Sequence, residues 1–177
     1  VDQAIALATT DAVVVPAARL LVGAGRTDAA RTLAARLEQQ VQKRSRAVGA
    51  LIRAEIALAA KRPVEAIDAL SEARKLADLW LVRYLLGRVY VEQGKYAEAI
   101  AELEACQKRI GEATDVFLDD WPTFRYTVPL SYWLARAQDG LGLADSAARN
   151  YRAYLSLRET VVGDALAADA RKRTASR

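Results

Sequence analysis

Apolar and small residues recur along the chain at helical spacing, in stretches separated by short turns. The sequence at 94–100 is repeated, with changes, at 25–31, 61–67 and 142–148. In each copy a helix breaker or basic residue precedes an alanine, which is typical of one helix ending and the next packing back against it. This repetition predicts four helix–turn–helix units, with nine to ten helices and no strand.

Each unit places two small residues where its helices are expected to cross. Only glycine, alanine or serine lets two helices approach to about 8–9 Å. The pairs are Ala18/Ala30, Ala54/Ala66, Gly87/Ala99 and Ala135/Ala147. The pattern therefore predicts an all-α solenoid with units at 11–46, 47–79, 80–113 and 128–161.

Three segments lie outside these units in what we expect to be a single domain. Residues 1–10 are interpreted as the remnant of a preceding helix, and 114–127 as an insertion of 14 residues before the last unit. Residues 162–177 are expected to form a capping helix and tail, with Leu166 facing inward, because the end of a solenoid needs a polar cover.

The third unit carries the most specific pattern. It has Leu86-Gly87 at its seventh and eighth places, Tyr90 at the eleventh, Ala99 at the twentieth and Leu103 at the twenty-fourth. In these positions it resembles a tetratricopeptide repeat. The resemblance implies an α-solenoid that binds protein partners, although a fold of this kind does not by itself identify the partner.

A second resemblance concerns about the last 65 residues. This region resembles the C-terminal tetratricopeptide tails of bacterial serine/threonine protein kinases and related multidomain regulators. The similar segments are DVFLDDWPTFRY, PLSYWLARAQDGLGL and ALAADARKR. The resemblance implies that this chain is the interaction part of a longer protein, and the absence of methionine fits an excised piece. No kinase motif lies within the chain.

Composition excludes several classes of function. The chain has 177 residues, no histidine and one cysteine, Cys106, so it offers no imidazole base and no His/Cys metal site. We therefore expect no enzyme activity, no metal and no cofactor. A net charge of +4, spread along the chain, argues against nucleic acid, and no apolar run is long enough to span a membrane. The compartment stays open, with the cytoplasm favoured.

The second, fifth, ninth and twelfth positions of each first helix share one face, because their spacings follow the helical turn, and the resemblance places that face on a concave wall. The second and fifth positions are apolar, whereas the ninth are charged. The candidate groove residues are Leu51, Leu81, Tyr84 and Tyr132 as an apolar floor, with Arg19, Glu55, Arg88 and Arg136 above it. These positions lack the Lys and Asn of a chaperone-tail clamp and the polar code of RNA-reading repeats.

Two interpretations of this wall remain open. Either Glu55 pairs with a neighbouring Arg in a solvated stripe, or the wall binds a peptide with apolar anchors and acidic flanks. The insertion is expected to be ordered, with Trp121 or Phe124 packed on the adjacent helices or lying across the groove mouth. The alternative function is a structural solenoid that self-stacks through its end faces.

Overall fold

The computed structural model describes residues 11–114, 123–159 and 161–175. Within these ranges it has ten α-helices, one short 3-10 helix and no strand, so the predicted all-α helical repeat solenoid is confirmed. The helices are α2 (Asp11–Gly23), α3 (Thr27–Glu38), α4 (Lys43–Ala59), α5 (Pro63–Leu76), α6 (Trp80–Glu92), α7 (Tyr96–Lys108), α8 (Ile110–Thr114), η1 (Phe124–Tyr126), α9 (Thr127–Gly140), α10 (Ala144–Ser156) and α11 (Ala165–Ala175).

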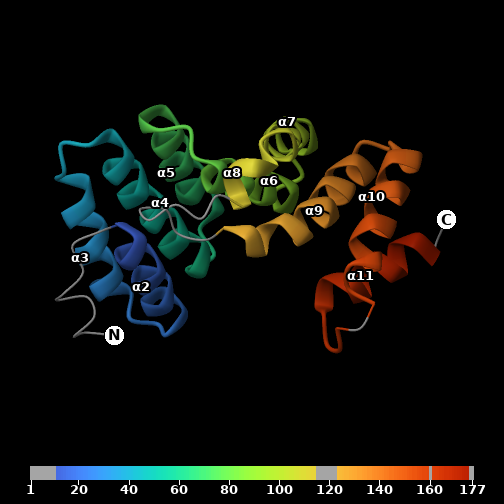
Figure 1. Ribbon diagram of the computed structural model, residues 1–177, viewed down its shortest axis with the longest axis horizontal. Coiled ribbons are helices and arrows are strands. Elements are labelled where there is room, and N and C mark those ends of the chain that lie inside the picture. Colours follow the sequence, from blue (N-terminus) through green and yellow to red (C-terminus); the bar gives the residue numbers. More distant parts are fainter. Residues whose placement is uncertain (1–10, 115–122, 160, 176–177) are drawn as a thin grey trace.

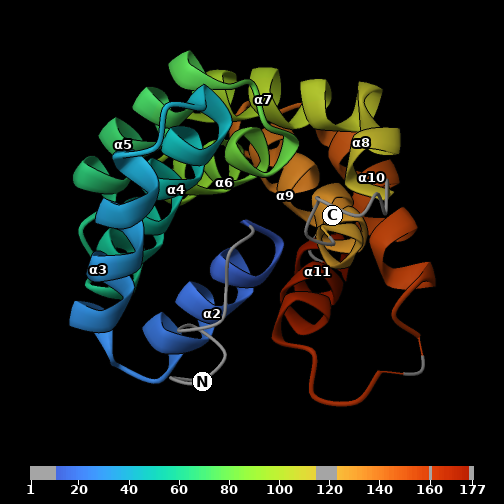
Figure 2. The ribbon, with the colours of Figure 1, turned by 60° about the vertical axis from the view of Figure 1, so that its left-hand side comes forward.

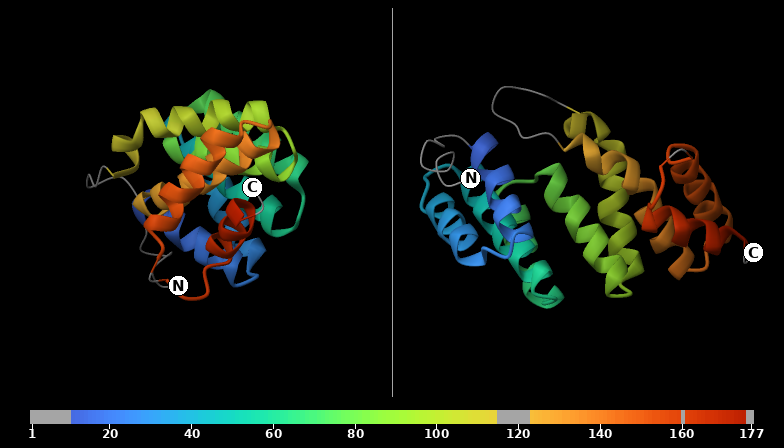
Figure 3. Two further views of the ribbon diagram at one scale, coloured as in Figure 1. Left: turned by 90° about the vertical axis from the view of Figure 1, so that its right-hand side faces the viewer. Right: turned by 90° about the horizontal axis from the view of Figure 1, so that it is seen from below.

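Consecutive helices form antiparallel pairs that follow one another along an arc (Figure 1). The first helices of the pairs, α2, α4, α6 and α9, lie on the inner side of the arc, and their partners lie outside (Figure 2). Helices α2 and α11 are at opposite ends of the array (Figure 3). The inner surface is therefore built almost entirely from first helices.

The recurring turn has one backbone requirement. Gly25, Gly94 and Gly142 occupy equivalent places with φ of 73°, 71° and 74°, in the left-handed region that favours glycine. Lys61 takes this place in the second unit with φ of 57°. The backbone shape of the turn is thus kept in all four units, even where the glycine is not.

The helices cross closely at Gly87, as predicted. A Cβ added to Gly87 would lie 2.5 Å from Cγ of Leu103, and Ala99 is completely buried. Ala135 and Ala147 are also completely buried. A further tight approach, which the sequence analysis did not identify, occurs at Gly49, where an added Cβ would lie 2.8 Å from the carbonyl oxygen of Ala34.

Some element boundaries differ from the prediction. Helix α4 begins at Lys43, earlier than the expected unit start at 47, because no glycine or proline stops the helix there. At the insertion, α8 continues to Thr114, and η1 leads directly into α9. The middle of the insertion, including Trp121, lies outside the described residues.

A capping helix is present, and two alanines share its inward face with Leu166. The backbone amides of Leu166 and Ala167 donate to Oδ1 of Asp164 at 3.0 and 3.2 Å, which caps the start of α11. Ala167 and Ala170 are completely buried, whereas Leu166 is only partly buried. Leu166 packs against the hydrophobic core, as expected, and the small alanines beside it let α11 approach α10 closely.

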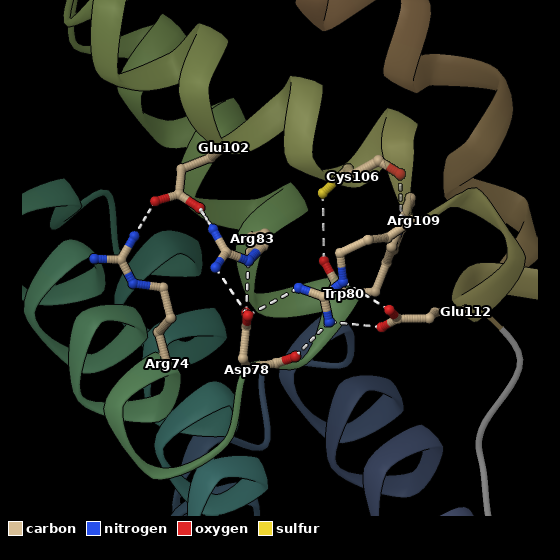
Figure 4. A network of polar contacts seen from close by, with 8 residues as sticks. All are labelled: Arg74, Asp78, Trp80, Arg83, Glu102, Cys106, Arg109 and Glu112. Carbon is tan, nitrogen blue, oxygen red and sulfur yellow. Dashed lines mark hydrogen bonds and ion pairs between the residues drawn. The ribbon is translucent and has the colours of Figure 1, made fainter.

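The second and third units are joined on their outer side by ion pairs (Figure 4). Glu102 on α7 is 6% exposed and pairs with both Arg74 of α5 and Arg83 of α6. Asp78, in the linker between the units, pairs with Arg83 and Arg109. Charged side chains thus link α5, α6 and α7 where the two units meet.

Candidate partner-binding surface

The expected apolar floor is not an open surface. Leu51, Leu81, Tyr84 and Tyr132 are at most 3% exposed and belong to the hydrophobic core. Successive units pack so closely that the side chain at the fifth position of each first helix contacts the neighbouring helices. The expectation that these four side chains form an accessible floor is therefore wrong, and their contribution is to hold the first helices together.

A concave hollow does exist on the inner side, and three of the four ninth-position residues line it. It has a volume of about 360 Å³ and is formed by α2, α4, α6 and η1. We call it the inner hollow. Its lining residues are Arg19, Val22, Gly23, Glu55, Leu58, Ala59, Leu85, Arg88 and Tyr126.

Arg19 and Glu55 form an ion pair across two successive units. Nη2 of Arg19 lies 2.5 Å from Oε1 of Glu55, and the two side chains are 15% and 12% exposed. Burial raises the pKa of Glu55, although the nearby guanidinium of Arg19 acts in the opposite direction. Glu55 thus pairs with a neighbouring Arg, as one of the two sequence interpretations held.

Arg88 leaves part of its guanidinium available to solvent. Its side chain is 42% exposed, and its Nε donates to Glu92 at 3.0 Å within the same helix. The guanidinium also lies 5.4 Å from the ring centre of Trp133. Because an exposed pair at this spacing contributes little free energy, Arg88 can exchange Glu92 for another carboxylate at low cost.

Tyr126, in the last part of the insertion, brings an aromatic ring to the inner hollow. Its ring centre lies 5.0 Å from that of Tyr84 and 5.0 Å from the guanidinium of Arg19. Arg125 also lies 4.9 Å from this ring and donates to the Tyr126 hydroxyl at 2.9 Å. The described end of the insertion therefore touches both the first and the third unit.

Phe124, one of the two aromatic residues considered for packing on the adjacent helices, is exposed. Its side chain is 57% exposed. The prediction was that Trp121 or Phe124 packs on the adjacent helices or lies across the groove mouth, and it stays a prediction for Trp121, which lies outside the described residues. The anchor is instead Thr123, which is 7% exposed and donates from Oγ1 to the carbonyl oxygen of Ala113 at 3.1 Å. This bond fixes the start of η1, and the turn then directs Tyr126 rather than Phe124 inward.

Arg136 lies apart from the inner hollow. It donates to the hydroxyl of Tyr132 at 3.0 Å and lies 3.6 Å from Oδ2 of Asp169 on α11. The Tyr132 hydroxyl in turn donates to Asp169 at 2.8 Å. At the fourth unit the capping helix thus already supplies an acidic partner to the residues that the sequence analysis assigned to the groove.

The chemistry of the inner hollow follows from its charges. Of the described side chains, Arg19, Arg88 and Arg125 lie in or beside it, against the carboxylates of Glu55 and Glu92, which leaves one positive charge in excess among them. Guanidinium groups beside an aromatic ring suit carboxylate recognition. Sequence analysis did not assign Tyr126 to this surface, because it lies in the insertion, outside the repeat. Two of the apolar lining residues, Val22 and Leu58, occupy the same twelfth place of their units, on the face that the periodicity had indicated.

Comparison with known proteins agrees with this architecture. Residues 57–112, from the end of α4 into α8, match the family model described as Tetratricopeptide repeat. No curated protein and no solved structure gives a significant match. No helix in the described parts of the chain has the length and apolar character needed to cross a bilayer. Repeats of the matched family generally mediate protein–protein interaction and are generally non-catalytic, so the match supports a role in binding protein partners.

Proposed function

We propose that the inner surface of this solenoid binds a segment of a partner protein that carries acidic residues next to apolar ones. One observation supports this most directly. Side chains from three successive first helices, Arg19, Glu55 and Arg88, meet at one hollow with positive charge in excess. A surface assembled from successive repeats suits an extended or helical segment that runs along them.

The proposed function is that of a scaffold rather than an enzyme. The inner hollow has arginines and one buried carboxylate but no histidine or cysteine, since the only cysteine, Cys106, is buried in the core elsewhere. We further propose that the domain serves as the interaction part of a longer regulator, such as a bacterial serine/threonine kinase. This proposal is supported by the resemblance of the last third of the sequence to the C-terminal tails of such kinases.

The test uses two sets of short synthetic peptides. In one set Leu, Ile or Phe alternates with Asp or Glu, and in the other Lys and Arg replace the acids. We expect the acidic set to bind more tightly, with an affinity that falls as salt is added. Fluorescence anisotropy of labelled peptides measures both quantities.

The matching protein variant is Arg88→Glu with Arg125→Glu. Both side chains reach solvent, so reversal should weaken binding roughly tenfold or more without unfolding the chain. The control is Arg36→Glu with Arg152→Glu, the same charge change at exposed positions on α3 and α10. Arg136 is not used, because a glutamate there would face Asp169 and disturb the cap.

Two results contradict the proposal. The first is equal binding of the acidic and basic peptide sets, and the second is unchanged binding by the Arg88/Arg125 variant. The alternative of self-stacking gives a molecular mass that rises with concentration when no peptide is present. One end of the array is covered by α11, whose Arg171 and Lys172 are exposed, which disfavours stacking at that end.

A further inference from the structure

The inner hollow lies where two first helices separate. The backbones of α2 and α4 come close at several points, as do those of α6 and α9, whereas α4 and α6 barely touch. Their outer partners α5 and α7 are joined to the same junction through the ion pairs of Glu102. The inner hollow therefore lies between α4 and α6, on the inner side of the arc.

The walls of the inner hollow are largely apolar, while its rim is charged. Val22, Leu58 and Leu85 form the walls, together with Gly23 and Ala59. At about 360 Å³, it is at the small end of the range for sites that enclose a whole ligand. A space of this size suits one or two residues of a longer segment.

We propose that the inner hollow receives one apolar side chain of the bound segment, and that an acidic residue directly beside it pairs with Arg88 and Arg125. This inference rests on the proposed function and specifies its ligand. The apolar side chain displaces water from Val22 and Leu58, which are only partly buried. The neighbouring carboxylate takes up the excess positive charge at the rim.

The existing pairing favours an anionic occupant over a cationic one. Among the described residues Glu55 is the one carboxylate that lines the inner hollow, and Arg19 already holds it at 2.5 Å. A lysine or arginine from a partner would have to displace Arg19 and would also face Arg88 and Arg125. A carboxylate has to displace only Glu92, which is 37% exposed, from Arg88.

Two glycines allow a matched test. Gly23 lines the inner hollow, and a Cβ added to it meets nothing within 4 Å, so the first carbon of a Gly23→Leu side chain has open space at the edge of the inner hollow. Gly111 in α8 has the same freedom but does not line the inner hollow. We expect Gly23→Leu to weaken binding of the best acidic peptide roughly tenfold or more, and Gly111→Leu to leave it unchanged.

The peptide supplies the second half of the experiment. Its apolar residues are replaced by glycine, one at a time. We expect a single position at which the wild-type protein loses as much binding free energy as the Gly23→Leu variant loses towards the unchanged peptide. At that position the peptide change and the Gly23→Leu change should not add, because both remove the same contact. Ala59→Leu, a second lining position that is exposed, should repeat the effect of Gly23→Leu.

The outcomes separate this inference from the proposed function. If Gly23→Leu and Ala59→Leu bind as tightly as the wild type while the Arg88/Arg125 variant does not, the inference about the inner hollow is wrong and the proposed function stands. If no acidic peptide binds better than its basic counterpart, both are wrong. Weak binding by Gly111→Leu as well would show a loss of fold rather than a blocked site, and thermal unfolding of the three leucine variants detects it.

Discussion

Trp80 and Cys106 are joined by two hydrogen bonds. Nε1 of Trp80 donates to the carbonyl oxygen of Cys106 at 2.9 Å, and Sγ of Cys106 donates to the carbonyl oxygen of Trp80 at 3.6 Å (Figure 4). The start of α6 is thereby tied to the end of α7. The same contact keeps the thiol away from solvent.

We expect Cys106 to be unreactive in the folded protein. Burial, assisted by the nearby Glu102 carboxylate, raises the pKa of its thiol to about 12, so almost no thiolate is present at pH 8. Labelling by a disulfide reagent should then occur only as fast as the chain opens, and urea should accelerate it. The control is Ser156→Cys in a Cys106→Ala background, since residue 156 is exposed and should react at once. Rapid labelling of native Cys106 would contradict the described packing.

Gly87→Leu should destabilise the third unit by overpacking. The added Cβ alone would lie 2.5 Å from Cγ of Leu103, so the α6–α7 crossing must open. We expect a loss of about 1–3 kcal/mol or more in the free energy of unfolding, measured by urea denaturation. Gly111→Ala is the control, because its Cβ has open space and alanine favours a helix; it should be neutral or slightly stabilising.

Glu102→Ala should weaken the junction between the second and third units. Two arginines would lose their shared carboxylate, but they are 41% and 22% exposed and can still be hydrated. We therefore expect a loss of about 1–3 kcal/mol, below the usual cost of breaking a fully buried pair. Glu104→Ala, an exposed position on the same helix, should change the free energy of unfolding by about 0.5 kcal/mol or less. Equal effects of the two variants would show that the ion pairs of Glu102 contribute nothing to the free energy of unfolding.

Asp164 should make the attachment of α11 sensitive to acid. Burial alone would raise its pKa, but hydrogen bonds from Arg158, Tyr154 and two backbone amides outweigh burial and lower the pKa to about 2. A lowered pKa stabilises the fold fully above the ordinary value of about 3.9, and this contribution is lost as the pH falls towards 2. Thermal unfolding from pH 6 to pH 2 should therefore show a smaller acid-induced loss in Asp164→Asn than in the wild type. If the unfolding temperature fell with pH equally in both proteins, the predicted role of Asp164 would be wrong.

Glu55→Gln should strengthen the binding of acidic peptides by a few-fold. The substitution removes the negative charge that opposes a peptide carboxylate, and Arg19, which is 15% exposed, keeps a hydrogen-bonding partner. Glu65→Gln, an exposed position on α5, is the control for the change in net charge. Anisotropy measured at low and high salt checks the electrostatic origin, and weaker binding by Glu55→Gln would show that Glu55 itself contacts the ligand.

Local spacing was enough to predict the repeat but not the inner surface. The small pairs, such as Gly87 with Ala99, are set by a contact inside one unit, and sequence reports them directly. Whether Tyr84 is exposed depends on how tightly successive units curve, which no single unit specifies. The structure buries it to 3% and sets Tyr126 against it, so the aromatic side chain at the inner hollow comes from the insertion.

Charge pairing across units was only half predictable for the same reason. The ninth positions were identified from the periodicity, and Arg19, Glu55 and Arg88 do converge. Arg136 does not join them: it lies on α9, which does not line the inner hollow, and it pairs with Asp169 of α11. The position of a capping helix depends on its own first turn, here fixed by Asp164, and the repeat pattern does not contain that information.

The separation of α4 from α6 has a mechanical consequence. The joint between the second and third units is fastened by ion pairs along its outer edge and has little backbone contact along its inner edge. Bending about such a joint costs least when the outer edge acts as the hinge and the inner edge opens or closes. Salt weakens these ion pairs, so we expect the joint between the second and third units to become less stiff as the ionic strength rises.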